Sequence, residues 1–418
     1  MSLSVTSPLS NFKSTISYIF QEPPPDFTCP PMDVLRSICS FLNDPKDVIH
    51  FGLANRSLSI LCKDEELWNL LWHKHFPNSC VKPKSETEGL AGYQRLANVM
   101  RNVKAGKCQH QTFSMYQTEI TCMKILNDKF ICGTLDGTIK TWDFNTRQEP
   151  QMLGRHQGRI NCMAIWYGKL ISASNDFTIK IWDLDKGEKL QTLKGHQNKV
   201  SWITVWGDKL ASGSCNGLIK IWDLNTWQEL QELQGHQNTI SCMVIWDNKL
   251  ISSSYDQMIK IWDLDTGRTL QTLQEDDYVE CITMYGDELV SGSEHSWISI
   301  WDPNTGKRLE KLKTSSCGLH DIMTWNGQLI SISSDCMIKI WDPHTRQELW
   351  MKGQKDQSGI NCMTILDDSK FATSFGDEIS IWDFSSPHLN HSGVALKPSK
   401  KRALDDDKCA STSPKKRS

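Results

Sequence analysis

Short runs of β-branched and aromatic residues alternate with polar turn residues over most of the chain, a pattern typical of strands. The stretch 199–233 shows one such unit, in which three polar groups separate the apolar runs. One of these groups, Asn216-Gly217, predicts a type I′ hairpin turn. We expect four antiparallel strands in this unit, at 199–205, 210–214 and 218–223, with a last one ending near Leu233.

The dipeptide Trp-Asp closes the third predicted strand of each unit and recurs with spacings of 40, 40, 40, 39, 40 and 41 residues. The tryptophans of the seven dipeptides are Trp142, Trp182, Trp222, Trp262, Trp301, Trp341 and Trp382. This register resembles that of WD-repeat proteins and implies a seven-bladed β-propeller with one unit per blade. The fold is therefore expected to be mainly β.

The seventh unit has no fourth strand of its own, because a polar stretch follows Trp382-Asp383. Gln111-Thr112-Phe113, before the first unit, matches Gln191-Thr192-Leu193 in a fourth strand. We expect the segment around 107–113 to complete the last blade and to cover its open edge.

The WD-repeat resemblance also implies a buried hydrogen-bonded chain of His, Asp, Ser and Trp within a blade. Two units carry the complete set, and their named members are His156, Asp176 and Trp182, and His236, Asp256 and Trp262. The third unit has Asn216 in place of the Asp, and units 1, 5, 6 and 7 lack the His, which predicts looser later blades. Ser, His and Asp together could suggest a nucleophilic enzyme. Repetition from blade to blade, and the lack of a Gly-x-Ser-x-Gly elbow, favour a structural role, so no catalytic residue is predicted.

Residues 30–77 have helical apolar spacing and resemble the F-box, whose pattern is matched at Pro31, Asp33, Leu35, Ile38, Leu42, Asp44-Pro45-Lys46-Asp47 and Leu67-Trp68. An F-box implies binding to the small adaptor protein that links substrate receptors to a cullin scaffold. The residues expected to bind this adaptor are Pro31, Leu35, Ile38, Leu42, Pro45, Leu67 and Trp68. The alternative is a small helical hairpin that caps the propeller.

The chain is thus divided into a small all-α F-box domain and a propeller, with three further segments. Residues 78–105 form a linker in which Tyr93, Leu96, Met100 and Val103 predict one face of a helix. The expected divisions are a disordered segment at 1–29, the F-box at 30–77, the linker at 78–105, the propeller at 106–385 and a disordered basic tail at 386–418.

Composition adds several exclusions. A formal charge of −3 predicts no general attraction to nucleic acid or membrane, and no apolar run has the length of a membrane span. The 15 cysteines include no Cys-x-x-Cys pair, so we expect neither a zinc site nor a disulfide framework, and no other cofactor. Five cysteines recur at one position of the first strand and are expected to be small buried side chains: Cys122, Cys162, Cys242, Cys281 and Cys362.

The basic tail has two features that bear on location. Lys401-Arg402 and Lys415-Lys416-Arg417 resemble a bipartite nuclear-import signal, and Ser413-Pro414 resembles a proline-directed kinase site. A solvated tail is the alternative. We expect a protein of the cytoplasm, the nucleus or both.

Taken together, the chain resembles the F-box/WD-repeat substrate receptors of cullin-RING ubiquitin ligases. The resemblance implies a non-catalytic subunit that binds an adaptor at one end and a target protein at the other. Two alternatives stay open. One is an interaction scaffold that no longer engages a ligase, favoured by Pro30 and Leu58 where the F-box pattern has Leu and Trp. The other is a bacterial effector that borrows ligases inside a host cell.

Target-contacting positions are expected at the start of each first strand and just before each blade Asp. None of these positions is Arg, which predicts an unphosphorylated peptide or a folded surface as the target. Glu280 and Glu294 favour a basic stretch of that target. The predicted contact residues are Thr121, Asn161, Asn175, Ser201, Ser241, Tyr255, Glu280, Glu294, His320 and Asn361.

Overall fold

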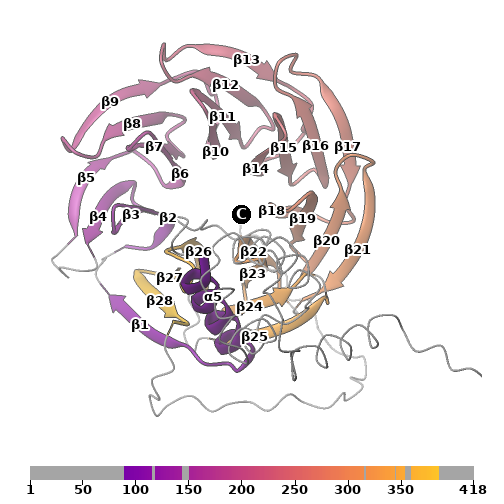
Figure 1. The fold of residues 1–418 in the computed structure, drawn as a ribbon. Coiled ribbons are helices and arrows are strands. Elements are labelled where there is room, and N and C mark those ends of the chain that lie inside the picture. Colours follow the sequence, from indigo (N-terminus) through magenta and orange to yellow (C-terminus); the bar gives the residue numbers. More distant parts are fainter. Residues whose placement is uncertain are drawn as a thin grey trace, which may run out of the picture. The chain divides into compact units, whose positions relative to one another are not determined.

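The computed structural model describes residues 89–114, 118–143, 150–314, 317–343, 345–353 and 359–385. The described residues form one helix and 28 strands, and the strands make seven four-stranded antiparallel sheets arranged as blades around a ring (Figure 1). The predicted seven-bladed propeller is therefore confirmed.

Each of the first six blades is built from four strands that are consecutive in the chain. Blade 1 contains β2 (Ile120–Leu126), β3 (Lys129–Thr134), β4 (Thr138–Asp143) and β5 (Gln151–Arg155). Blade 2 contains β6 (Ile160–Trp166), β7 (Lys169–Ser174), β8 (Ile179–Asp183) and β9 (Glu188–Leu193). Blade 3 contains β10 (Val200–Trp206), β11 (Lys209–Ser214), β12 (Ile219–Asp223) and β13 (Glu229–Leu233). Blade 4 contains β14 (Ile240–Trp246), β15 (Lys249–Ser254), β16 (Met258–Asp263) and β17 (Thr269–Gln274).

The remaining blades follow in the same order. Blade 5 contains β18 (Val279–Tyr285), β19 (Glu288–Ser293), β20 (Trp297–Asp302) and β21 (Lys307–Lys313). Blade 6 contains β22 (Leu319–Trp325), β23 (Gln328–Ser333), β24 (Met337–Asp342) and β25 (Gln347–Gly353). Blade 7 contains β26 (Ile360–Ile365), β27 (Lys370–Phe375), β28 (Glu378–Asp383) and β1 (Gln109–Ser114).

The ring is closed by β1, which comes from the opposite end of the described chain. β1 pairs antiparallel with β28 over six residues, from Gln109 opposite Asp383 to Ser114 opposite Glu378 (Figure 1). The outer edge of blade 7 is thus covered, and the predicted closure by the segment around 107–113 is confirmed.

The turn at Asn216-Gly217 differs from the predicted type I′ hairpin. Gly217 has φ +81°, but Asn216 does not have positive φ, and the Gly217 N–H donates to the Ser214 carbonyl at 3.2 Å. This is a turn over Cys215 and Asn216 followed by a left-handed glycine, so the loop is one residue longer than a type I′ turn. A Cβ at Gly217 would lie 2.4 Å from the carbonyl oxygen of His236, so glycine is required there.

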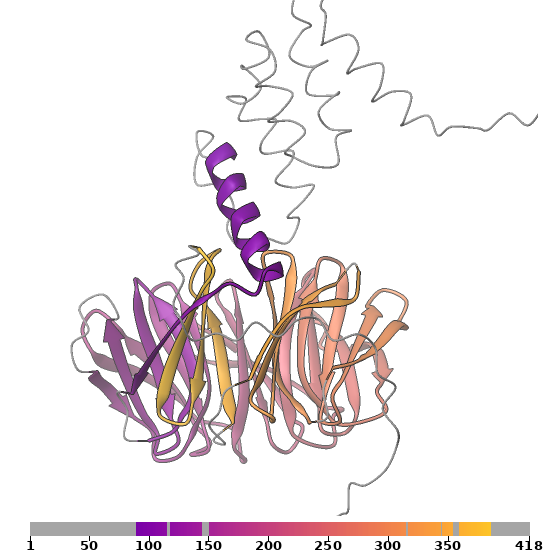
Figure 2. The ribbon, with the colours of Figure 1, turned by 90° about the horizontal axis from the view of Figure 1, so that it is seen from below.

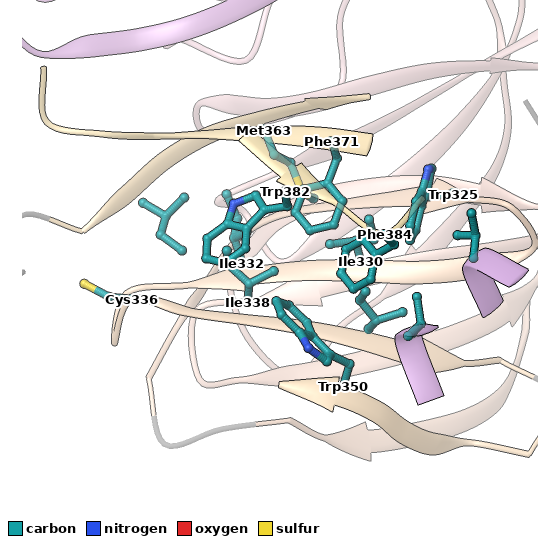
Figure 3. Packing of buried hydrophobic residues seen from close by; sticks show 14 of the residues in the cluster. Trp325, Ile330, Ile332, Cys336, Ile338, Trp350, Met363, Phe371, Trp382 and Phe384 are labelled. Carbon is teal, nitrogen blue, oxygen red and sulfur yellow. The ribbon is translucent and has the colours of Figure 1, made fainter. Parts of the chain in front are cut away.

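The apolar core lies between blades rather than within them. In one cluster, Ile219 and Ile221 of blade 3 pack against Ile240, Leu250 and Trp262 of blade 4. A single blade therefore exposes its apolar faces until its neighbours are in place. The cluster between blades 6 and 7 is rich in aromatic rings, contributed by Trp325, Trp350, Phe371, Trp382 and Phe384 (Figure 3).

Helix α5 (Gly89–Lys104) packs its last turns on this aromatic cluster. Val99 and Val103 are buried in the cluster, and the Asn102 side-chain amide donates to the Phe384 carbonyl at 2.7 Å. Of the predicted apolar face, Val103 is buried and Met100 is half-buried, whereas the described side chains do not include Tyr93 and Leu96. Val99 is the contact that the sequence prediction missed. Nowhere in the described residues is a helix long and apolar enough for a membrane span.

Candidate functional site

Blades 2 and 4 contain the complete hydrogen-bonded chain. In blade 2, Trp182 Nε1 donates to Ser172 Oγ at 2.8 Å, Ser172 Oγ lies 2.7 Å from His156 Nε2, and His156 Nδ1 lies 2.9 Å from Asp176. Blade 4 repeats these contacts through Trp262, Ser252, His236 and Asp256, with all three distances at 2.8 Å.

The direction of each bond follows from the Asp. An ionised carboxylate can only accept, so the His Nδ1–H donates to it, the His Nε2 accepts from the Ser, and the Ser accepts from the Trp. Burial raises the pKa of Asp176, but hydrogen bonds from His156, Thr178 and the Gln157 N–H outweigh it and hold that pKa well below its usual range. The chain is therefore fully paired with an ionised Asp.

These networks are structural and offer no nucleophile to a substrate. Ser172 and Ser252 are both 0 % exposed, and each hydroxyl already has the Trp as donor and the His as acceptor. A reacting carbonyl cannot reach the Ser oxygen without opening the blade, which argues against acyl transfer at this trio.

Blade 3 contains an incomplete version of the chain. Trp222 Nε1 donates to Ser212 at 2.8 Å, and His196 Nε2 lies 2.7 Å from Ser212, but His196 Nδ1 is buried with no hydrogen-bond partner in the described part of the chain. The carbonyl oxygen of the Asn216 side chain instead accepts from the Ser214 hydroxyl and, at 3.4 Å, from the Leu218 N–H. Burial and nearby Lys220 lower the pKa of His196 to about 4, so its ring is neutral at pH 7.

The other blades keep the Trp bond by different means. The Trp donates to Ser291 in blade 5, Ser331 in blade 6 and Thr373 in blade 7, each at 2.9 Å. In blade 5 the buried carboxylate of Glu275 takes the place of the His and accepts from Ser291 at 2.6 Å. Among the described residues, Nε1 of Trp142 in blade 1 has no hydrogen-bond partner, so the missing bond lies in the first blade rather than in the later ones.

Four of the seven predicted target contacts at the start of the first strands instead form hydrogen bonds between blades. Each first strand has a register shift at this residue, and the resulting bulge turns four of the side chains toward the next blade. These four donate to next-blade carbonyls: Thr121 to Ile160, Asn161 to Val200 at 2.8 Å, Ser201 to Ile240 at 2.6 Å and Asn361 to Ile120 at 3.1 Å. Thr121 is buried, so it cannot contact a target.

The other predicted contacts are half-buried or exposed. Asn175 accepts a hydrogen bond from Asn161 at 2.8 Å, and Ser241 lies 2.9 Å from the Ser253 hydroxyl. His320 is exposed, with its Nε2 at 3.2 Å from the Ser334 hydroxyl. Figure 2 shows α5 on one face of the ring, where it packs near Trp325 at the end of β22. His320 is near the beginning of β22, so these residues lie on the face opposite to α5.

Blades 4 and 5 place an acidic and aromatic cluster on this face. The Tyr255 hydroxyl donates to the Glu280 carboxylate at 2.8 Å, and the rings of Tyr255 and Tyr278 are 6.0 Å apart. Burial raises the pKa of Glu280, as do Glu294 and Asp277, although the bond from Tyr255 lowers it. Within the described residues neither Glu280 nor Glu294 forms an ion pair. The cluster is therefore a surface of uncompensated negative charge beside an exposed tyrosine ring.

A neighbouring group has donor atoms close enough together for a cation. The ligand atoms of Asp277, Glu294 and His295 lie within 4.8 Å of one another. Asp277 already accepts hydrogen bonds from the backbone N–H and the ring Nδ1 of His295, so hydrogen bonding accounts for their approach.

The five repeated cysteines are buried, as expected from their position. Cys162 Sγ lies 3.6 Å from the Ile203 carbonyl and Cys242 Sγ lies 3.5 Å from the Ile282 carbonyl, each in the next blade. Burial raises the pKa of the Cys362 thiol to about 12, against the hydrogen bond with Ser374. Such thiols stay protonated and unreactive at neutral pH.

Asp321 occupies the cysteine position in blade 6, where burial raises its pKa to about 6 although Lys124 and the Ile322 and Met363 N–H groups lower it. Because the pKa of Asp321 is raised in the folded protein, ionisation of its carboxyl group destabilises the fold. The stability that the protonated carboxyl contributes is fully present below about pH 4 and is lost as pH rises through about 6.

We expect Asp321→Asn to raise the free energy of unfolding by about 1–2 kcal/mol at neutral pH and to leave it unchanged near pH 4. Denaturant unfolding at both pH values measures this. An equal change at both would contradict it.

Comparison with known proteins agrees with the fold. The family model described as WD domain, G-beta repeat matches residues 148–183, 187–223 and 227–263. Among solved structures, the crystal structure of the computationally designed Ika8 protein is 28 % identical with a TM-score of 0.56, over 64 % of this chain and 84 % of that one. The comparison with curated proteins gave no match.

The fold and the repeats define a β-propeller that serves as a scaffold for protein–protein interaction. The chain carries WD40 repeats, and three of them are matched by the family model. No function of one particular protein comes with this likeness, since 1704 chains of solved structures match the fold.

Two sets of predicted residues lie outside the described part of the chain. The first is the adaptor-binding set, Pro31, Leu35, Ile38, Leu42, Pro45, Leu67 and Trp68. The second is the import signal, Lys401, Arg402, Lys415, Lys416 and Arg417. Both sets remain predictions from the sequence.

Proposed function

We propose that this protein is the substrate receptor of a cullin-RING ubiquitin ligase, with the segment 30–77 binding the adaptor and the propeller binding the target. The observation that supports this division is the position of α5. The helix that follows the F-box-like segment is packed on one face of the ring by Val99 and Val103, and the opposite face carries the exposed polar and acidic side chains. This arrangement supports a division in which the adaptor binds on the side of α5 and the target binds the opposite face.

Such a receptor performs no bond chemistry. Its contribution is to hold a target lysine near an enzyme bound elsewhere on the scaffold, which raises the effective concentration of one for the other. The packing of α5 on blades 6 and 7 supports this role, because it joins the segment that precedes the helix to one face of the propeller.

The first test concerns the adaptor. Leu35→Ala with Ile38→Ala is expected to abolish co-purification of the adaptor and cullin, because truncation of a buried aliphatic side chain costs about 2–5 kcal/mol. The propeller should keep its melting temperature, since both residues precede α5. The matched control is Leu230→Ala with Leu270→Ala, which removes two exposed leucines from outer strands.

Two outcomes of this test separate the alternatives. Adaptor binding by the chain and its loss in the double variant would support the ligase receptor. No binding by the unaltered chain would favour the interaction scaffold, in which Pro30 and Leu58 have weakened the F-box. Unchanged binding by the double variant would contradict the F-box assignment.

The second test concerns the target face. Glu280→Gln with Glu294→Gln is expected to weaken binding of lysine- and arginine-rich peptides about three- to tenfold, because each surface charge pair contributes roughly 0.2–1 kcal/mol. Titrations at low and high salt measure this, and the loss should shrink at high salt. Asp265→Asn with Asp287→Asn removes the same charge from exposed turns at the other end of the strands and is the control. Equal weakening by both pairs would show a general charge effect and contradict a specific site.

A further inference from the structure

The turn at Asn216, where the hydrogen-bonded chain of blade 3 is incomplete, has the sequence Asn-Gly, which can react without an enzyme. Asn216 is exposed and is followed by Gly217, which has no side chain to hinder attack by its backbone nitrogen, although Gly217 is buried and its N–H donates to the Ser214 carbonyl at 3.2 Å. Asn216 stands at the position where blades 2 and 4 have Asp176 and Asp256. Asn216 therefore has an amide where the other two blades have a carboxylate.

The chemistry that converts one into the other needs only water. The Gly217 nitrogen attacks the side-chain carbonyl carbon of Asn216, the C–N bond of the amide breaks, and ammonia leaves as a five-membered imide ring forms. Water then adds to the imide and breaks the new C–N bond, which yields Asp with an unchanged main chain. The balance is one amide and one water consumed, and one carboxylic acid and one ammonia produced.

We propose that Asn216 is a site of spontaneous deamidation and that its Asp product completes the hydrogen-bonded chain of blade 3. The Asp product supplies a second carboxylate oxygen, which can accept the hydrogen bond from His196 Nδ1. His196 is 7 % exposed, and its Nδ1 is buried without a partner, while Ser212 and Trp222 already hold the rest of the ring in place. A carboxylate at this position accepts from His236 Nδ1 at 2.8 Å in blade 4.

The structure also favours Asp over the rearranged product. Opening the imide on its other side gives isoaspartate, which adds a carbon to the main chain ahead of Gly217. A Cβ at Gly217 would lie 2.4 Å from the His236 carbonyl oxygen, so the turn is packed too closely against blade 4 for that displacement. The modification is thus expected to repair the blade and not to damage it.

The chain contains a second Asn-Gly, at Asn326-Gly327, which is a control within the same molecule. Asn326 is 1 % exposed, and its side-chain amide donates to the Asp368 carbonyl. The Asn216 side chain is hydrogen-bonded as well, through its oxygen, but it is exposed to solvent, whereas water does not reach the buried Asn326 amide. This dipeptide should persist while Asn216 is converted.

The experiment is incubation of the full chain at physiological temperature and mildly alkaline pH in water enriched in oxygen-18, followed by peptide mapping. Asn216 should convert several-fold faster than Asn326, with one solvent oxygen incorporated and Asp as the main product. The melting temperature of the incubated protein should rise toward that of Asn216→Asp. Asn216→Gln, which can only close a larger ring, should stay unmodified at its unincubated melting temperature.

Three results would overturn the proposal. Conversion of Asn216 no faster than that of Asn326 would show that the turn is protected. Isoaspartate as the main product, with a lower melting temperature, would show damage instead of repair. An Asn216→Asp variant no more stable than the unaltered chain would show that the carboxylate does not complete the blade. None of these results depends on the proposed ligase function.

Discussion

A chain that begins at residue 116 is expected to self-associate and aggregate. Without β1, blade 7 has three strands, and the backbone N–H and C=O groups of β28 form an open edge available to a second molecule. The apolar cluster between blades 7 and 1 becomes more exposed at the same time, because Phe113 of β1 packs against it. Size-exclusion chromatography and light scattering measure the outcome.

Two longer chains separate the contribution of β1 from that of α5. A chain that begins at Gly89 keeps both elements and should be monomeric, with the melting temperature of the full protein. A chain that begins at residue 106 keeps β1 but loses Val99 and Val103, which uncovers Trp325 and Phe384. It should remain closed but be less stable by about 1.5–3 kcal/mol for each of the two buried valine side chains lost. Equal solubility of all three chains would contradict the closure by β1.

The second large effect is expected in the network of blade 4. Asp256→Asn should lower the free energy of unfolding by about 1–3 kcal/mol, because it leaves His236 Nδ1 without its charged acceptor. The variant reproduces in blade 4 what blade 3 has at Asn216. Asp265→Asn, in an exposed turn of the same blade, is the matched control and should change stability little.

The pH dependence of this variant provides a further check. Burial raises the pKa of Asp256, but hydrogen bonds from His236 and the Gln237 N–H outweigh it and lower that pKa. A depressed pKa gives stability that is present above the pKa of the unfolded chain, about 3.9, and lost as the pH falls through the folded value. Denaturant unfolding should show a difference between Asp256→Asn and the unaltered chain that is full at pH 7 and shrinks below about pH 4. A difference independent of pH would mean that the carboxylate is not the stabilising group.

The number of blades and their closure could be predicted because the information is local and repeated. Each unit carries its own strand pattern and its Trp-Asp, so an error in one unit does not alter the period. The turn type predicted at Asn216 was wrong, because Asn-Gly occurs in more than one kind of hairpin loop. The observed loop includes Cys215, a residue that the dipeptide rule does not consider.

The surface was harder to predict, because it depends on where a side chain points and not on its type. Asn161 and Ser201 have the polarity of target contacts, but a bulge at each residue turns its side chain to the next blade. The role of Glu275 was not predicted, because the repeat pattern has His at that position. The function required is acceptance of the Ser291 hydroxyl, which a carboxylate also performs.

The pairing of β1 with β28 also determines how the molecule would respond to mechanical load. The segment that precedes α5 enters the ring through β1, and the segment that follows β28 leaves from the adjacent strand, so tension on either segment is carried by blade 7. The other six blades have both of their chain connections inside the ring and feel that tension only after blade 7 has yielded. A motor that threads the protein from either side therefore meets the pairing of β1 with β28 first, and the six opposed residue pairs of this antiparallel ladder form part of its first resistance.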